Sequence, residues 1–139
     1  KDAPVVNDEG LVGRVTKVTR DQSRVALLTD KESAVSAFDV QTEAYGVIRH
    51  GAGSGDSLIL DRVPKEDRVQ RNDVVVTSGR RFGLLPSIYP RNIPIGMVTS
   101  VGQTDIDVHQ QIQVDPFVDF SSLDSVLVLI RKIPGPQKP

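Results

Sequence analysis

The stretch GAGSGDSLIL, residues 51–60, contains residue types that could support catalysis or phosphate binding. Its Gly-Asp-Ser-Leu string can surround a serine nucleophile, here Ser57, and His50 stands directly before the stretch. The spaced glycines also suggest a loop that cradles a phosphate. A third interpretation is a tight turn between two strands, because glycine adopts positive φ without steric cost.

A catalytic Ser57 would need a base that the sequence does not place at the expected spacing. Hydrolases with this string activate the serine through a distant Asp-x-x-His on an α/β sheet. Here Asp105 and Asp107 precede His109 by four and two residues, not three. The glycine spacing G-x-G-x-G, with no helix behind it, does not match a dinucleotide loop either. We therefore interpret residues 51–56 as a wide turn and Ser57 as the start of a strand.

Ser78 raises a similar question, because it stands beside Gly79 and follows His50 in the chain, as in trypsin-like proteases. It lacks the preceding Gly-Asp and the second following glycine that help to form an oxyanion hole. The chain has no cysteine and two histidines, so neither a thiolate site nor a histidine-rich metal site is expected. The sequence thus predicts no catalytic residue, no metal site and no cofactor.

Composition places the chain among soluble globular domains and disfavours nucleic-acid binding. The 139 residues are 38% hydrophobic and 25% charged, with a formal net charge of −1 and no basic stripe. The longest apolar run, Val126–Ile130, is far shorter than a membrane-spanning helix. The sequence begins at Lys1 rather than Met, so we interpret it as a fragment that leaves room for an N-terminal membrane anchor.

Short valine-rich runs predict an all-β fold. The chain has 21 Val and 9 Ile against 10 Leu and 6 Ala, and β-branched side chains favour strands. The runs are bounded by turn residues and cover 11–16, 25–29, 35–40, 45–48, 58–60, 74–77, 95–101, 106–108, 112–114 and 126–130. No long helix is expected, although Asp119 could cap a short turn. Strands at this spacing predict an antiparallel barrel or a pair of small barrels.

The segment SGRRFGLLPSIYPRNIP, residues 78–94, is expected to be a functional loop because it is long and lacks strand signals. It mixes arginine, aromatic and aliphatic residues, as interface hot spots do. The predicted partner-binding residues are Arg80, Arg81, Phe82, Leu84, Leu85, Ile88 and Tyr89. In a competing interpretation the apolar ones fold back over a barrel. Strand addition at an open sheet edge is a second predicted binding mode.

Six segments, in this order, resemble MreC, the bacterial rod shape-determining protein family. They are GLVGRVTKV (10–18), SRVALLTD (23–30), YGVIRHGAGSGDSLIL (45–60), RNDVVVTSG (71–79), YPRNIPIGMV (89–98) and VDPFVDFSSLDSVLVL (114–129). The last contains a Pro-x-x-Asp-Phe-x-x-Leu pattern that begins at Pro116. The chain departs from the family at Asn72, where glycine is usual, but asparagine also tolerates a left-handed turn.

The resemblance implies two small antiparallel β-barrels with trypsin-like barrel topology and no catalysis. By analogy, an outer lobe would comprise residues 1–44 and 113–133, an inner lobe 45–112, and a disordered tail 134–139. The family implies a single-pass membrane protein whose anchor precedes this fragment, with the fragment on the extracytoplasmic side. It also implies a scaffold of the cell-wall elongation machinery (elongasome). Its partners would be a class B penicillin-binding transpeptidase, MreD and other elongation proteins, besides further copies of itself.

Two other functions remain open at this point. One is a β-barrel serine hydrolase that uses Ser57 or Ser78. The other is a module that binds cell-wall glycan or peptide directly, although aromatic residues make up only 4% of the chain and sugar sites favour aromatic stacking.

Overall fold

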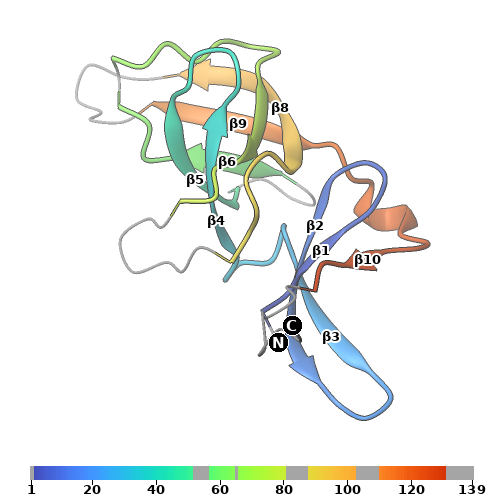
Figure 1. Ribbon diagram of the computed structural model, residues 1–139. Helices are drawn as coiled ribbons and strands as arrows, with labels where there is room; N and C mark the ends of the chain where they lie inside the picture. The colour runs from blue at the N-terminus through green and yellow to red at the C-terminus, as the bar shows by residue number, and fades with distance from the viewer. Residues whose placement is uncertain (1, 52–56, 65, 81–87, 103–109, 131–139) are drawn as a thin grey trace, which may run out of the picture.

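The computed structural model describes residues 2–51, 57–64, 66–80, 88–102 and 110–130, which form a closed barrel and an open sheet (Figure 1). The strands are β1 (Pro4–Val6), β2 (Leu11–Val18), β3 (Ser23–Leu27), β4 (Ala34–Asp39), β5 (Tyr45–His50), β6 (Leu58–Asp61), β7 (Val74–Thr77), β8 (Pro94–Gly102), β9 (Gln111–Pro116) and β10 (Leu127–Val128). A 3-10 turn, η1 (Phe120–Ser122), precedes β10.

The barrel closes in the order β4-β5-β6-β9-β8-β7, and every neighbouring pair is antiparallel. Alternation along the strands explains its core. Leu58 and Leu60 of β6 are fully buried, and their partners across the sheet are Val114 and Ile112 of β9. Because successive side chains point to opposite faces, the residues between them lie nearer the solvent. Closure leaves the barrel without a free edge.

The open sheet has the order β10-β1-β2-β3, so β10 and β3 are its edges. The two edges differ in character. β3 begins with exposed Ser23 and Arg24, whereas both residues of β10, Leu127 and Val128, are exposed and apolar. A cluster of Val5, Val12, Val15 and Val118 is the sheet's own buried core.

Two leucines join the sheet to the barrel. Leu11 and Leu28 are fully buried, and both belong to the barrel's hydrophobic cluster rather than to the sheet's own. Phe120 packs against both clusters. On the barrel side, the Phe117 amide donates to the Ile95 carbonyl (3.0 Å). The two units are therefore held against each other by buried apolar contacts.

The all-β, antiparallel class is confirmed. Of the two barrels expected, one is a closed barrel, and the other is an open four-stranded sheet in the described part of the chain. The predicted cap is confirmed, because the Asp119 side chain accepts from the Ser121 amide at the start of η1. Asn72 adopts a φ of 76°, the left-handed turn expected there. The sequence patterns missed β1, and the predicted strand 106–108 lies outside the described residues.

The pairing of β4 and β9 differs from the lobe boundaries expected from the sequence. That division placed residues 1–44 and 113–133 in the outer lobe, whereas β4 and most of β9 pair inside the barrel. β4 is needed there because it closes the barrel between β5 and β7. As limits of separate domains, the expected boundaries at 44 and 112 remain a prediction.

Candidate functional site

The opening motif does not assemble a reactive group among the described residues. Nδ1 of His50 lies 2.9 Å from the Thr29 carbonyl, so the ring is tied to the chain between β3 and β4. Ser57 lies one residue before β6, and its carbonyl accepts from the Gly51 amide (2.9 Å). The bond between Gly51 and Ser57 closes the turn between β5 and β6. His109 and its neighbouring aspartates lie outside the described residues.

Ser78 is a structural link between β4 and the chain after β7. Only 2% of it is exposed, and its hydroxyl lies 2.8 Å from the Ser36 hydroxyl. The Ser78 amide donates to the Ser36 carbonyl (3.0 Å), and the Ser78 hydroxyl accepts from the Arg80 amide (3.1 Å). These bonds satisfy a buried polar side chain and position the first residues of the predicted functional loop.

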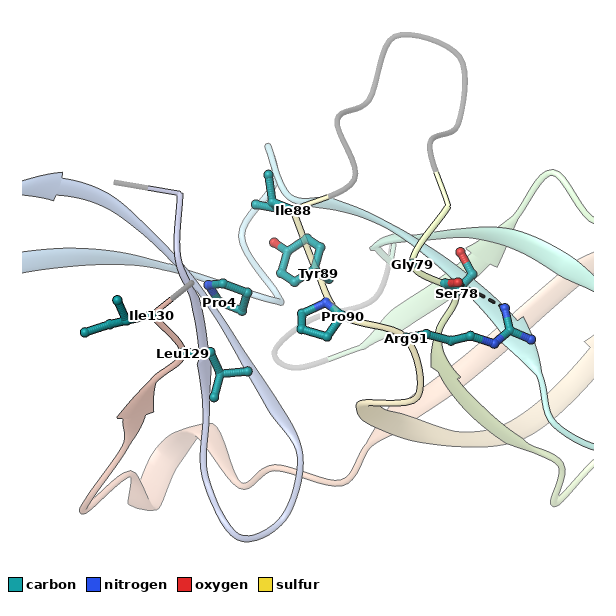
Figure 2. A pocket seen from close by; sticks show the side chains of 9 residues that line it. All are labelled: Pro4, Ser78, Gly79, Ile88, Tyr89, Pro90, Arg91, Leu129 and Ile130. Carbon is teal, nitrogen blue, oxygen red and sulfur yellow. Dashed lines mark hydrogen bonds between the residues drawn. The ribbon is translucent and has the colours of Figure 1, made fainter. Parts of the chain in front are cut away.

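A groove of about 530 Å³ lies between the barrel and the open sheet (Figure 2). Its volume is in the range typical of ligand pockets. Figure 2 shows one side formed by the open sheet and the other by the barrel, and the groove is lined by Pro4, Ser78, Gly79, Ile88, Tyr89, Pro90, Arg91, Leu129 and Ile130. On the sheet side, the Leu129 amide donates to the Pro4 carbonyl (2.8 Å), which holds the end of β10 beside β1.

The barrel side of the groove is a segment that we call the strap, residues 88–93. Thr77 at the end of β7 anchors it: its hydroxyl donates to the Pro90 carbonyl (2.6 Å) and accepts from the Ile93 amide (2.8 Å). Gly79 has a φ of +70°, and a Cβ there would lie 3.2 Å from Cβ of Arg91. A side chain would thus be strained at Gly79, and glycine lets the strap pack close to β7.

Tyr89 fixes the strap against both units. Only 8% of the residue is exposed, and it belongs to the barrel's hydrophobic cluster. Burial raises the pKa of its hydroxyl to about 12, while the charges of Arg14 and Asp2, on the open-sheet side, act in opposite directions. Tyr89 therefore stays neutral at physiological pH and acts mainly through packing.

Two arginines and two aromatic rings form a cluster next to the groove, which we call the arginine–aromatic cluster. Phe38 and Tyr45, at the facing ends of β4 and β5, stack with ring centroids 5.3 Å apart. The Arg80 guanidinium lies 4.0 Å from the Tyr45 ring centroid, and that of Arg91 lies 4.2 Å from the Phe38 centroid. Such contacts hold a cation in place without a carboxylate.

A buried acid pair supports the turn that carries this cluster. One carboxylate oxygen of Asp39, the residue after Phe38, accepts from the amides of Gln41 (2.8 Å) and Thr42 (3.2 Å). Burial, together with the hydrogen bond and charge of neighbouring Asp73, raises the pKa of Asp39 to about 7. The second oxygen is buried without a donor, so a proton placed there can be shared with Asp73.

The structure brings together three of the predicted partner-binding residues. Ile88 and Tyr89 line the groove, and Arg80 stands in the adjacent cluster. Arg81, Phe82, Leu84 and Leu85 lie outside the described residues. The prediction did not include Phe38, Tyr45, Arg91, Pro4, Leu129 and Ile130. Arg91 lies in the same loop, two residues after Tyr89, so the composition of the loop could have pointed to it as well.

Neither a cluster of metal-ligating side chains nor a membrane-spanning helix is found in the described part of the chain. No group of three or more histidine or acidic side chains is placed to hold a metal ion within those ranges. Among the same residues, no helix combines the length and the apolar character needed to cross a bilayer.

Comparison with known families and sequences gives a consistent result. The family model described as "Rod shape-determining protein MreC, barrel core" matches residues 1–130. A cell shape-determining protein MreC from Caulobacter vibrioides is 34% identical over 129 residues, which cover 93% of this chain and 34% of that relative. The chain spans about a quarter to a half of the length of the curated relatives it matches.

Solved structures share the fold. The crystal structure of MreC from Pseudomonas aeruginosa gives a TM-score of 0.82 at 22% identity and covers 93% of this chain and 79% of that one. A complex between penicillin-binding protein (PBP2) and MreC from Helicobacter pylori gives a TM-score of 0.65 at 20% identity, covering 84% of this chain and 68% of that one.

Proposed function

This chain belongs to the MreC family of rod shape-determining proteins, and from that membership we propose that it is a non-catalytic docking domain of the cell-wall elongation machinery. Its partner in this proposal is a class B penicillin-binding transpeptidase. The observation that carries the proposal is the groove between barrel and open sheet, with the arginine–aromatic cluster beside it. The Helicobacter pylori relative in complex with PBP2 supports the choice of partner.

The groove has the chemistry of a protein-docking surface. Its lining includes apolar residues from both units, and Ile130 at its edge is 83% exposed. A partner that covers an exposed isoleucine beside an apolar concavity removes apolar surface from water, and this burial stabilises the complex. Arginine and tyrosine next to such a concavity are the residue types enriched at binding hot spots.

The wider role follows from the family and belongs to the same proposal. The domain would act on the extracytoplasmic side of a membrane-anchored protein and would help to organise MreD and other elongation proteins. It would also contribute to self-association. In that role it maintains the rod shape of the cell through the enzymes it gathers, without chemistry of its own.

Binding of this domain to the transpeptidase ectodomain from the same organism tests the proposal. We expect saturable binding in biolayer interferometry, and we expect Ile130→Asp to weaken it roughly tenfold, as for an apolar contact that a partner covers. Val18→Asp is the matched control, because Val18 is also an exposed apolar strand-end residue. Absence of binding by the wild-type domain, or an equal loss in both variants, would contradict the proposal.

The non-catalytic part of the proposal has its own test. Incubation with a fluorophosphonate probe should leave the domain unlabelled. The Ser78 hydroxyl is in hydrogen-bond contact with Ser36 and the His50 ring with the Thr29 carbonyl, so His50 does not activate Ser78. Labelling that disappears in Ser57→Ala or Ser78→Ala would instead favour the hydrolase alternative.

A further inference from the structure

The two arginines of the arginine–aromatic cluster have no acidic partner among the described residues. The ion pairs in that part of the chain join Arg14 to Asp2 and Arg49 to Asp61. Arg80 and Arg91 are both exposed and lie over aromatic rings. None of the described residues that line the groove or form the cluster carries a carboxylate. A chain with a net charge of −1 thus places two arginines, neither with a carboxylate partner among the described residues, over the two rings of one stacked pair.

Arg91 is held so that one edge of its guanidinium stays open. Nη1 donates to the Ser78 carbonyl (3.1 Å) and to the Tyr45 hydroxyl (3.3 Å), and Nη2 donates to the same hydroxyl (3.3 Å). These bonds to described residues leave Nε–H and the second Nη2–H, which point along the same edge. That edge matches the two oxygens of a carboxylate in a bidentate pair.

The same arginine belongs to the groove as well as to the cluster. Arg91 and Ser78 line its barrel side, and Figure 2 shows the arginine extending from the strap toward Ser78. Most of the remaining lining is apolar, from Ile88 and Pro90 on the strap to Leu129 on the open sheet. A ligand that satisfies both parts must therefore carry a carboxylate close to a large apolar side chain.

We infer that the groove and the arginine–aromatic cluster together bind an acidic, apolar segment of a partner protein. In this arrangement a glutamate or aspartate pairs with the open edge of Arg91, Arg80 supplies the second positive charge, and a neighbouring large apolar side chain enters the groove. The inference rests on the proposed function, since the partner segment is taken to come from the transpeptidase.

The pre-positioned arginines favour binding of a carboxylate, and the apolar groove favours a protein segment over a cell-wall fragment. Both guanidiniums are pre-positioned by ring contacts, so little side-chain entropy is lost on binding. Wall peptides also carry carboxylates, but short alanine-type side chains would leave the apolar groove largely unfilled, and burial scales with apolar area.

Charge reversal tests the inference on the partner itself. R80E/R91E is expected to weaken binding to the transpeptidase ectodomain on the order of 10- to 100-fold, with most of the wild-type affinity also lost at high salt. R24E/R71E makes the same change in charge at two exposed arginines outside the site and should leave binding nearly unchanged. R91K keeps the charge but loses the two-donor edge, and a several-fold loss is expected.

These measurements separate the two proposals. Wild-type binding that R80E/R91E leaves intact would overturn the inference while the proposed function stands. Equal losses in R80E/R91E and R24E/R71E would also overturn it, because the effect would then be general electrostatics. Circular dichroism and the melting temperature of each variant show whether the fold is kept.

A partner-independent experiment decides the inference if the ectodomain does not bind. A random twelve-residue peptide display library selected on the wild-type domain should enrich sequences with Asp or Glu beside Leu, Ile or Phe. Binding of the selected peptides should fall at least tenfold when Glu is changed to Gln, since the open edge of Arg91 then loses its charged acceptor. Selected peptides without acidic residues, or insensitive to R80E/R91E, would overturn the inference. So would soluble muropeptides that bind through Arg91 in place of protein peptides.

Discussion

The closed barrel and the open sheet differ in how their strands are paired and in how their apolar side chains are buried. In the barrel each strand pairs on both sides, and its cluster, which has sixteen buried residues in the described part of the chain, includes Ile48, Leu60 and Ile112. The open sheet has two unpaired edges and a cluster of four buried valines. It completes its packing by placing Leu11 and Leu28 in the barrel's cluster.

The difference indicates a division of roles. The barrel has the larger core and holds the strap and the arginine–aromatic cluster in place. The open sheet is small, has two edge strands and packs against the barrel. It forms the other side of the groove through Pro4 and Leu129. Surface that is not needed for closure remains free for a partner, as the exposed apolar residues of β10 illustrate.

The largest effect is expected in the barrel core. Leu60→Ala should destabilise the domain by about 3–5 kcal/mol, because the side chain is fully buried and the closed barrel cannot collapse around the cavity. Val12→Ala in the open sheet's small cluster should cost less, about 1–2 kcal/mol. Urea unfolding followed by circular dichroism gives both values. A larger loss for Val12→Ala would reverse the assigned roles.

A slightly smaller effect tests whether the sheet depends on the barrel. Leu28→Ala removes a contact that the sheet side makes with the barrel's cluster, and we expect a loss of about 2–4 kcal/mol in one cooperative transition. Hydrogen exchange should show protection falling in both units together. If the sheet opens at low urea while the barrel stays protected, the two units are independent.

The buried acid pair predicts a pH effect of intermediate size. Folding raises the pKa of Asp39 from 3.8 to about 7, so the folded chain holds a proton in this window that the unfolded chain releases. Its contribution to stability is therefore complete below about pH 4 and is lost as the pH rises to about 7. Asp39→Asn keeps the turn acceptor and should stabilise the domain by about 1–3 kcal/mol at pH 8.

Measured denaturation midpoints between pH 4 and pH 8 check this expectation. The wild type should lose stability across the window, and Asp39→Asn should lose less. Asp21→Asn, in the exposed turn between β2 and β3, is the control and should leave the wild-type slope unchanged. Parallel curves for wild type and Asp39→Asn would contradict the shared proton.

The smallest effect is expected at the edge of the open sheet. Leu127→Lys should change the free energy of unfolding by no more than about 0.5 kcal/mol, because the side chain is 68% exposed. The same change should reduce concentration-dependent association if the β10 edge pairs with other chains. Analytical ultracentrifugation compares the two proteins. A loss of stability near 2 kcal/mol would mean that β10 is part of the core.

Particular elements show which features of the fold can be predicted from sequence patterns. The runs of β6 and β9 alternate cleanly and were predicted because one face of each strand is buried. β1 was missed, since three residues that begin with a proline carry no periodic signal and form a strand only through β2 and β10. Asp119 was predicted as a cap because that chemistry is local.

The candidate site was predicted only in part for the same reason. Arg80 and Ile88 belong to a loop whose composition points to binding. Phe38 and Tyr45 resemble ordinary strand residues in sequence, and their roles depend on pairing across β4 and β5. Tyr89 was expected at a partner surface but is mostly buried, because the strap turns it inward between the two units.

From its residue order alone this chain is determined to be strand-rich, because β-branched alternation and turn residues act over a few neighbouring positions. The resemblance to the MreC family came separately, from six segments in the family's order. Tertiary structure decided that one unit closes while the other keeps two edges, and that two arginines of one loop lie over aromatic rings from β4 and β5 beside a groove. Those outcomes depend on contacts between segments far apart in the chain, and short-range patterns do not encode such contacts.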